Sequence, residues 1–185
     1  MNLSELIMPW SAKGWEKMQS MNISIPALAW KLVLPLSFLP PVLLYYAGTH
    51  YDNSYIQNFP EKNWHFITTT FFLAELLTFF VMGWLIHSVL ESHDLAINYH
   101  DAYLLAAIAP IPMWLSSLGL LIPSALITGI FAGVGLVASC VILYLGTSAL
   151  CHRNTDDVVS MSATYTIMSA AFLAWIMLMV IVWAY

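Results

Sequence analysis

Long apolar runs separated by short polar segments make up most of this chain of 185 residues. A helix needs about 20 predominantly apolar residues to cross a bilayer, and five runs approach or exceed that length. They cover residues 27–48, 66–90, 102–121, 124–149 and 161–184. Charged residues make up only 8% of the chain, whereas a soluble domain carries roughly 25%. The sequence therefore predicts an all-α protein in a lipid bilayer, a polytopic bundle of five transmembrane helices.

The segment before the first span, residues 1–22, mixes apolar and charged side chains. Its apolar residues fall near one helical face: Leu3, Ile7, Trp10, Met18 and Met21. Pro9 favours a helix start, because proline is tolerated in a first turn. We expect an amphipathic helix that lies in the membrane plane with its tryptophans at the headgroups; the alternative is a disordered tail. The chain thus divides into an interfacial helix, 1–22, and a five-span membrane domain, 27–184.

Five spans place the two ends of the chain on opposite sides of the membrane. The basic residues on the N-terminal side are Lys13, Lys17 and Arg153, with Lys31 at the boundary. Lys62 falls on the other side. Because cytoplasmic loops carry an excess of basic residues, we expect the N-terminus in the cytoplasm and the C-terminus outside. The linkers 91–101 and 151–160 then face the cytoplasm. No basic run indicates nucleic-acid binding.

Prolines interrupt two of the predicted spans. They are Pro35, Pro40 and Pro41 in the first span and Pro110 and Pro112 in the third. Proline removes a backbone donor and kinks or breaks a helix. Irregular backbone at membrane depth is tolerated only inside protein or beside a water-filled cavity. We therefore hypothesise a cavity lined by these prolines and by the first three spans, with Glu75 on its wall.

Glu75 lies deep in the second predicted span. It is about nine residues in, or roughly 14 Å at a rise of about 1.5 Å per residue. An unpaired charged carboxylate at this depth costs several kcal/mol, so the side chain is expected to face the bundle, to be protonated, or both. The functional interpretation is proton or ion transport. The alternative is a structural carboxyl that hydrogen-bonds a threonine or a backbone carbonyl.

Acids and histidines concentrate at the end of the second span and in the linker after it. The candidate metal ligands are His87, Glu91, His93, Asp94, His100 and Asp101. If the helix continues past its predicted end, His87, Glu91 and Asp94 share one face. Imidazole and carboxylate groups suit a divalent metal such as Zn²⁺, although the pattern establishes no cofactor. The alternative is a solvated linker, with Asn98 as the N-cap of the third span and Asp101 in its first turn.

Small residues recur at four-residue steps in the fourth span. They are Ala125, Gly129 and Gly133. Such a row lets another helix approach closely. It predicts either a homodimer through Gly129 and Gly133 or helix packing inside a single bundle.

Several short motifs resemble those of a known family. They are an N-terminal helix with Pro9 and Trp15, LPLSFLPP (34–41), AIAP (107–110), PS (123–124) and VILYLGTSAL (141–150). Together they resemble the five-span Yip family, the Ypt/Rab-interacting proteins, and in size the chain is closest to its small bacterial inner-membrane branch. The resemblance implies a bacterial inner-membrane location. Eukaryotic relatives are linked to Rab GTPases and early secretory trafficking.

Two functions are consistent with these observations. The first is a Yip-like membrane scaffold that binds a protein partner at the cytoplasmic face built from residues 1–22, 91–101 and 151–160. The alternative is a transporter or channel for a divalent metal ion or a proton, which uses Glu75 and the cytoplasmic His/Asp cluster. The sequence contains no GxSxG, GxGxxG or P-loop motif, so we expect a protein that is not an enzyme.

Overall fold

The computed structural model describes residues 8–52, 55–56, 58–59, 61–95, 97–150 and 157–184. In this part of the chain the secondary structure is helical, without strands. Five helical segments here are long and apolar enough to cross a membrane: Ile25–His50, Trp64–Ser92, Tyr99–Leu121, Ala125–Leu150 and Met161–Val180. The prediction of an all-α bundle with five membrane spans is therefore confirmed.

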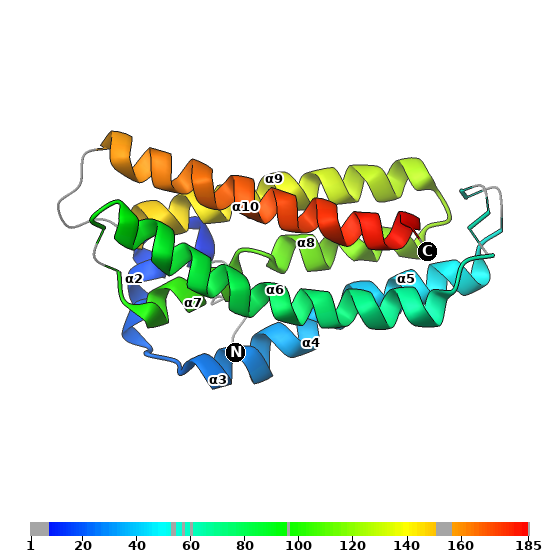
Figure 1. Cartoon of the computed structure of the whole chain (residues 1–185), viewed down its shortest axis with the longest axis horizontal. Helices are drawn as coiled ribbons and strands as arrows, with labels where there is room; N and C mark the ends of the chain where they lie inside the picture. Colours follow the sequence, from blue (N-terminus) through cyan, green and yellow to red (C-terminus); the bar gives the residue numbers. More distant parts are fainter. Residues whose placement is uncertain are drawn as a thin grey trace.

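Three of the spans are unbroken helices that run along the long axis of the molecule (Figure 1). They are α6 (Trp64–Ser92), α9 (Ala125–Leu150) and α10 (Asp157–Ala184). α10 packs against both α6 and α9. The two spans with prolines are divided into shorter helices, which pack against α6 and α9 and complete the bundle.

The first span changes its helical pitch just before Pro35. It consists of α3 (Ile25–Leu28), the π-helical segment η2 (Ala29–Val33), α4 (Leu34–Ser37) and α5 (Leu39–His50). The N–H of Leu34 bonds to the carbonyl of Ala29, five residues earlier. Pro35 has no N–H that could bond to the carbonyl of Lys31, and the π-helical turn accommodates this missing hydrogen bond. The α-helical hydrogen bonding of the span is thus interrupted, and the backbone is helical on both sides of the π turn.

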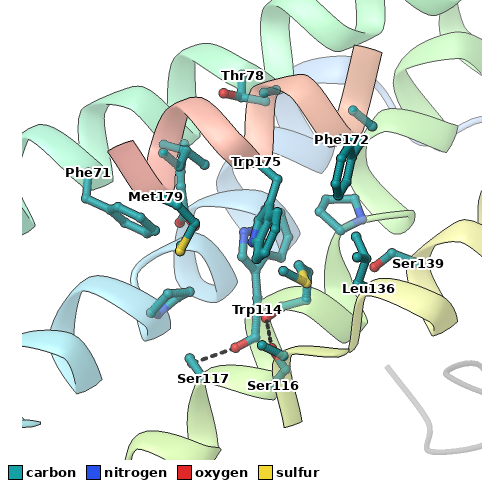
Figure 2. A pocket seen from close by; sticks show the side chains of 18 of the residues that line it. Phe71, Thr78, Trp114, Ser116, Ser117, Leu136, Ser139, Phe172, Trp175 and Met179 are labelled. Carbon is teal, nitrogen blue, oxygen red and sulfur yellow. Dashed lines mark hydrogen bonds between the residues drawn. The ribbon is translucent and has the colours of Figure 1, made fainter. Parts of the chain in front are cut away.

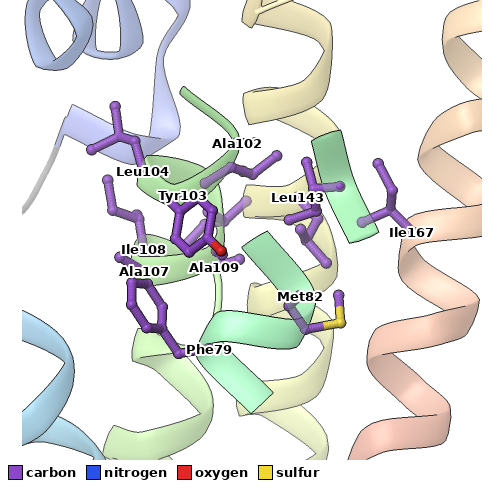
Figure 3. Close-up of a cluster of buried hydrophobic side chains, with 14 of the residues drawn as sticks. Phe79, Met82, Ala102, Tyr103, Leu104, Ala107, Ile108, Ala109, Leu143 and Ile167 are labelled. Carbon is purple, nitrogen blue, oxygen red and sulfur yellow. The ribbon is translucent and has the colours of Figure 1, made fainter. Parts of the chain in front are cut away.

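The third span is divided at its prolines, as their positions predict. α7 (Tyr99–Ile108) ends before the turn at Ala109 and Pro110, and α8 (Ile111–Ser116) and η3 (Ser117–Leu121) follow. Every residue from Ala102 to Ala109 is buried. α7 is therefore the central element of the larger hydrophobic core, which also contains Phe79 of α6, Leu143 of α9 and Ile167 of α10 (Figure 3).

The short helix α2 (Ala12–Ser20), preceded by η1 (Met8–Trp10), closes one end of the bundle. Trp15 is fully buried, and its Nε1 donates to the carbonyl of Pro9 at 3.0 Å. Its ring fills the space left by the missing side chain of Gly146 in α9. Trp15 is buried by protein, because the glycine opens a pocket for the whole indole, and the headgroup position of the tryptophans stays a prediction. Residues 1–7 of the predicted amphipathic helix lie outside the described part of the chain.

A second, smaller core closes the opposite end. Its buried members are Ala47, Tyr55, Phe59, Trp64 and Ile67. The Tyr51 hydroxyl donates to the carbonyl of Leu120 at 2.6 Å, and the Tyr55 hydroxyl donates to Thr128 Oγ1 at 3.0 Å. These two hydrogen bonds connect the loop between α5 and α6 to η3 and to the first turn of α9.

Glycines on the inner face of α9 let the helices touch, which leads to a stability prediction. A Cβ on Gly135 would lie 2.7 Å from Ser116 Cβ and 3.0 Å from the carbonyl oxygen of Pro112. Gly135→Ala is therefore expected to lower the free energy of unfolding by about 1–3 kcal/mol. We would measure it by SDS titration of the purified protein.

Gly133→Ala on the same helix is the matched control. A Cβ there would meet no other atom of the described chain within 4 Å. Because alanine is the better helix former, this variant should be unchanged or more stable by up to about 1 kcal/mol. An equal loss of stability in both variants would contradict the packing of α8 against α9.

Candidate functional site

A cavity of about 350 Å³ lies inside the bundle, between α5, α6, α8, α9 and α10. Figure 2 shows Trp114 of α8 and Phe172 and Trp175 of α10 directed into it. Most of the lining side chains are apolar. Two described residues with charged side chains line it, Glu75 and Lys62.

Glu75 lies on the wall of this cavity and is only 8% exposed. Its Oε2 atom is buried and has no hydrogen-bond partner among the described residues. Thr78, one turn further along α6, donates to the carbonyl of Ala74 at 2.7 Å instead. The Glu75 side chain thus faces the bundle, which is one of the outcomes that the sequence predicted. One of its carboxyl oxygens makes no hydrogen bond to a described residue.

Ser139 is a second buried polar group on the wall, and the sequence analysis missed it. It is 9% exposed, and its hydroxyl also lacks a hydrogen-bond partner in the described part of the chain. The sequence signal that could have identified Ser139 is its spacing from Gly135 and Gly146. Positions four and eleven residues apart share one helical face, and these three residues are buried.

Of the five prolines predicted to line the cavity, two do so, Pro40 and Pro110. Pro35, Pro41 and Pro112 do not line this cavity. Pro35 is exposed, Pro41 is buried and Pro112 is half-buried, each away from the cavity wall. Residues one, two or five positions apart lie on different helical faces, so prolines that interrupt one span do not all face its interior. Side chains of α9 and α10, which the prediction did not include, supply the rest of the wall.

The acid and histidine cluster is split by the structure into separate local contacts. His87 Nδ1 lies 3.7 Å from Glu91 Oε2, one helical turn away, and the Glu91 side chain is 76% exposed. His93 caps the end of α6, and Asp94 follows with a left-handed φ of 57°. The N–H of Leu95 then returns to the carbonyl of Leu90 at 2.9 Å, which is a Schellman helix end.

The remaining two residues of the cluster hold the N-terminal segment. The Gln19 side-chain amide donates to Asp101 Oδ2 at 3.2 Å, and His100 Nε2 contacts the carbonyl oxygen of Ile23. Among the described residues, no group of three histidine, cysteine, aspartate or glutamate side chains lies close enough to hold a metal ion. Metal binding by the six cluster residues stays a prediction, and the structure shows a structural contact for each of them.

The small-residue row of α9 faces outward. Ala125, Gly129 and Gly133 are exposed. Helix packing inside the bundle uses Gly135 and Gly146 instead, on another face of α9. A homodimer through Gly129 and Gly133 stays a prediction. The linker 151–160 falls largely outside the described residues, since the structure resumes at residue 157.

Comparison with known proteins gives one match. A family model described as the Yip1 domain matches residues 6–178. This match covers the first four spans, most of the fifth span and most of the residues that line the cavity. Neither the curated proteins nor the solved structures contain a significant match to the chain.

Proposed function

Since the chain belongs to the Yip1 domain family of membrane proteins, we propose that it is a membrane scaffold that binds a protein partner at one end of its bundle. The binding surface we propose is the outer face of α2, together with the helix end at His93 and Asp94. This is the cytoplasmic end in the orientation favoured by Lys13 and Lys17, with Lys62 at the opposite end. From the resemblance to the small bacterial branch, we propose that the protein is located in the inner membrane.

The observation that carries this proposal is the fixed position of α2. Trp15 anchors the helix in the core, and Gln19 bonds to Asp101 at the start of α7. On the opposite face, Lys13, Glu16 and Lys17 are exposed. A charged surface held in one conformation loses little conformational entropy on binding, which favours complex formation.

Site-specific photocrosslinking in native membranes tests the proposal. A photoreactive amino acid at Glu16 is expected to give a discrete crosslinked protein. Charge reversal with Lys13→Glu and Lys17→Glu should reduce its yield about tenfold or more, because rim charges steer association. The control position is Glu61, which is exposed at the other end of the bundle. A crosslink at Glu16 that survives charge reversal, or equal crosslinks at both positions, would argue against a specific partner on α2.

Transport is the second candidate function, favoured by the position of Glu75 on the cavity wall. A divalent cation such as Ca²⁺ or Mg²⁺ requires about six or more oxygen ligands. The described wall offers one carboxyl and a few hydroxyl groups amid apolar side chains. This chemistry is better suited to an uncharged molecule than to a metal ion.

A further inference from the structure

We propose that the cavity binds an uncharged, lipid-soluble molecule that presents one hydroxyl or carbonyl group to Glu75 and Ser139. Ligand pockets in proteins typically measure about 300–1,000 Å³, and this cavity measures about 350 Å³. At roughly 30 Å³ for a water-sized group, it accommodates on the order of a dozen non-hydrogen atoms. A medium-length hydrocarbon chain with one polar end has this size.

The apolar part of the wall suits a hydrocarbon. Phe71 and Phe79 of α6, Leu136 of α9, and Trp114 and Trp175 of the neighbouring helices line the cavity (Figure 2). Flat aromatic rings and branched aliphatic groups provide dispersion contacts and offer an acyl or alkyl chain no competing hydrogen bonds. The wall therefore selects for a molecule that already partitions into the bilayer.

Two unsatisfied polar atoms mark where the polar end of the ligand would bind. Glu75 and Ser139 come from different helices and line the same cavity, and the buried atoms Glu75 Oε2 and Ser139 Oγ have no hydrogen-bond partner in the described chain. A buried polar group without a hydrogen bond destabilises a protein, so such atoms are rare and require an explanation. A ligand that bonds to both atoms removes this penalty.

The neighbouring hydroxyl groups show that Ser139 is unusual. Thr78, Ser116 and Ser117 also line the cavity, and each donates to a backbone carbonyl three or four residues earlier at 2.6–2.7 Å. The dashed bonds of Ser116 and Ser117 are visible in Figure 2. Serine in an apolar helix commonly bonds back in this way. The Ser139 hydroxyl makes no such bond, so its hydrogen-bonding capacity is unused in the described chain.

The two polar atoms lie at comparable depths in the membrane. The loop before α6 is bonded to the first turn of α9 through Tyr55 and Thr128, so both helices start at the same end. At about 1.5 Å per residue, Glu75 lies roughly 17 Å along α6 and Ser139 roughly 21 Å along α9. A single functional group held between the two helices near mid-bilayer is compatible with these depths.

The charges on the wall select for an uncharged ligand. Lys62 lies at the outer end, where its Nζ donates to the carbonyl of Val182 at 3.1 Å. No other described lining residue carries a basic side chain. An ionised fatty acid would bring a carboxylate toward Glu75 without a cation to neutralise either, which is costly in a low dielectric. An alcohol or a carbonyl compound avoids that cost.

A photoreactive alcohol tests the inference. The full-length protein is reconstituted in phosphatidylcholine nanodiscs, irradiated with a twelve-carbon alcohol that carries a diazirine, and analysed by peptide mass spectrometry. We expect labelling on the cavity-lining positions of α6, α9 and α10. Dodecanol should compete for this labelling, and dodecane, which has the same chain and no hydroxyl, should compete about tenfold less, the effect of one hydrogen bond in an apolar site.

Two substitutions at Glu75 separate hydrogen bonding from charge. Glu75→Gln keeps a donor and an acceptor and should retain labelling within about threefold, whereas Glu75→Leu should reduce it about tenfold. Leu77→Ala, on the lipid-exposed side of the same helix, is the control and should label normally. Labelling that dodecane displaces as well as dodecanol, or that Glu75→Leu leaves unchanged, would overturn the inference. A cavity that contains only water would show no labelling above the lipid-facing background, which would also overturn it.

Discussion

Trp15→Ala is expected to lower the free energy of unfolding by about 3–5 kcal/mol, the range for removing a fully buried aromatic side chain. The ring has no exposed surface, and its edge lies against Gly146 of α9 and beside Leu105 of α7. Removing it leaves a cavity where this one side chain connects η1, α7 and α9. Because α2 is short, the loss should also release it from the bundle.

The measurement combines SDS titration with limited proteolysis in nanodiscs. We expect Trp15→Ala to become sensitive to protease after Lys13 and Lys17, whereas the wild-type protein is protected there by the docked helix. Trp30→Ala is the control, since Trp30 is 71% exposed on the first span and its loss removes little protein packing. If Trp30→Ala destabilised the protein as much as Trp15→Ala, the anchoring role of Trp15 would be wrong.

The spans could be predicted from the sequence because their signal is local. A run of apolar residues must cross the bilayer as a helix with its own hydrogen bonds satisfied. The observed limits of Trp64–Ser92 and Ala125–Leu150 differ from the predicted spans 66–90 and 124–149 by one or two residues. Pro110 likewise marked the division of the third span, because proline acts on its own helix.

The contacts between distant segments could not be predicted in this way. Trp15 is adjacent in sequence to charged residues, and only the position of Gly146 in space makes its pocket. The chemistry of His100 and Asp101 suggested metal ligands, and it did not indicate their contacts with Ile23 and Gln19, some eighty residues away. Residue type indicates which bonds a side chain can make, and the tertiary fold decides which partner it meets.

Glu75→Lys is expected to lower the free energy of unfolding by about 3 kcal/mol, the cost of a lysine near the centre of a membrane helix. The buried wall of the cavity gives the ammonium group no acidic partner among the described residues. Glu75→Leu is expected to act in the opposite direction and to stabilise the ligand-free protein by about 1–3 kcal/mol, because it removes a buried oxygen that makes no hydrogen bond. Glu75→Gln should change stability little, since the amide has a similar shape and no charge.

The sign of the Glu75→Leu effect distinguishes a binding residue from a structural one. If the carboxyl stabilised the fold through a bond within the protein, Glu75→Leu would destabilise it, and the cavity would have a structural role. If the carboxyl is kept for a ligand, the variant is more stable in SDS titration without ligand and gains less stability than the wild-type protein when dodecanol is added. Ser139→Ala, on the facing helix, should repeat both effects on a smaller scale, because it removes one hydroxyl from the same site.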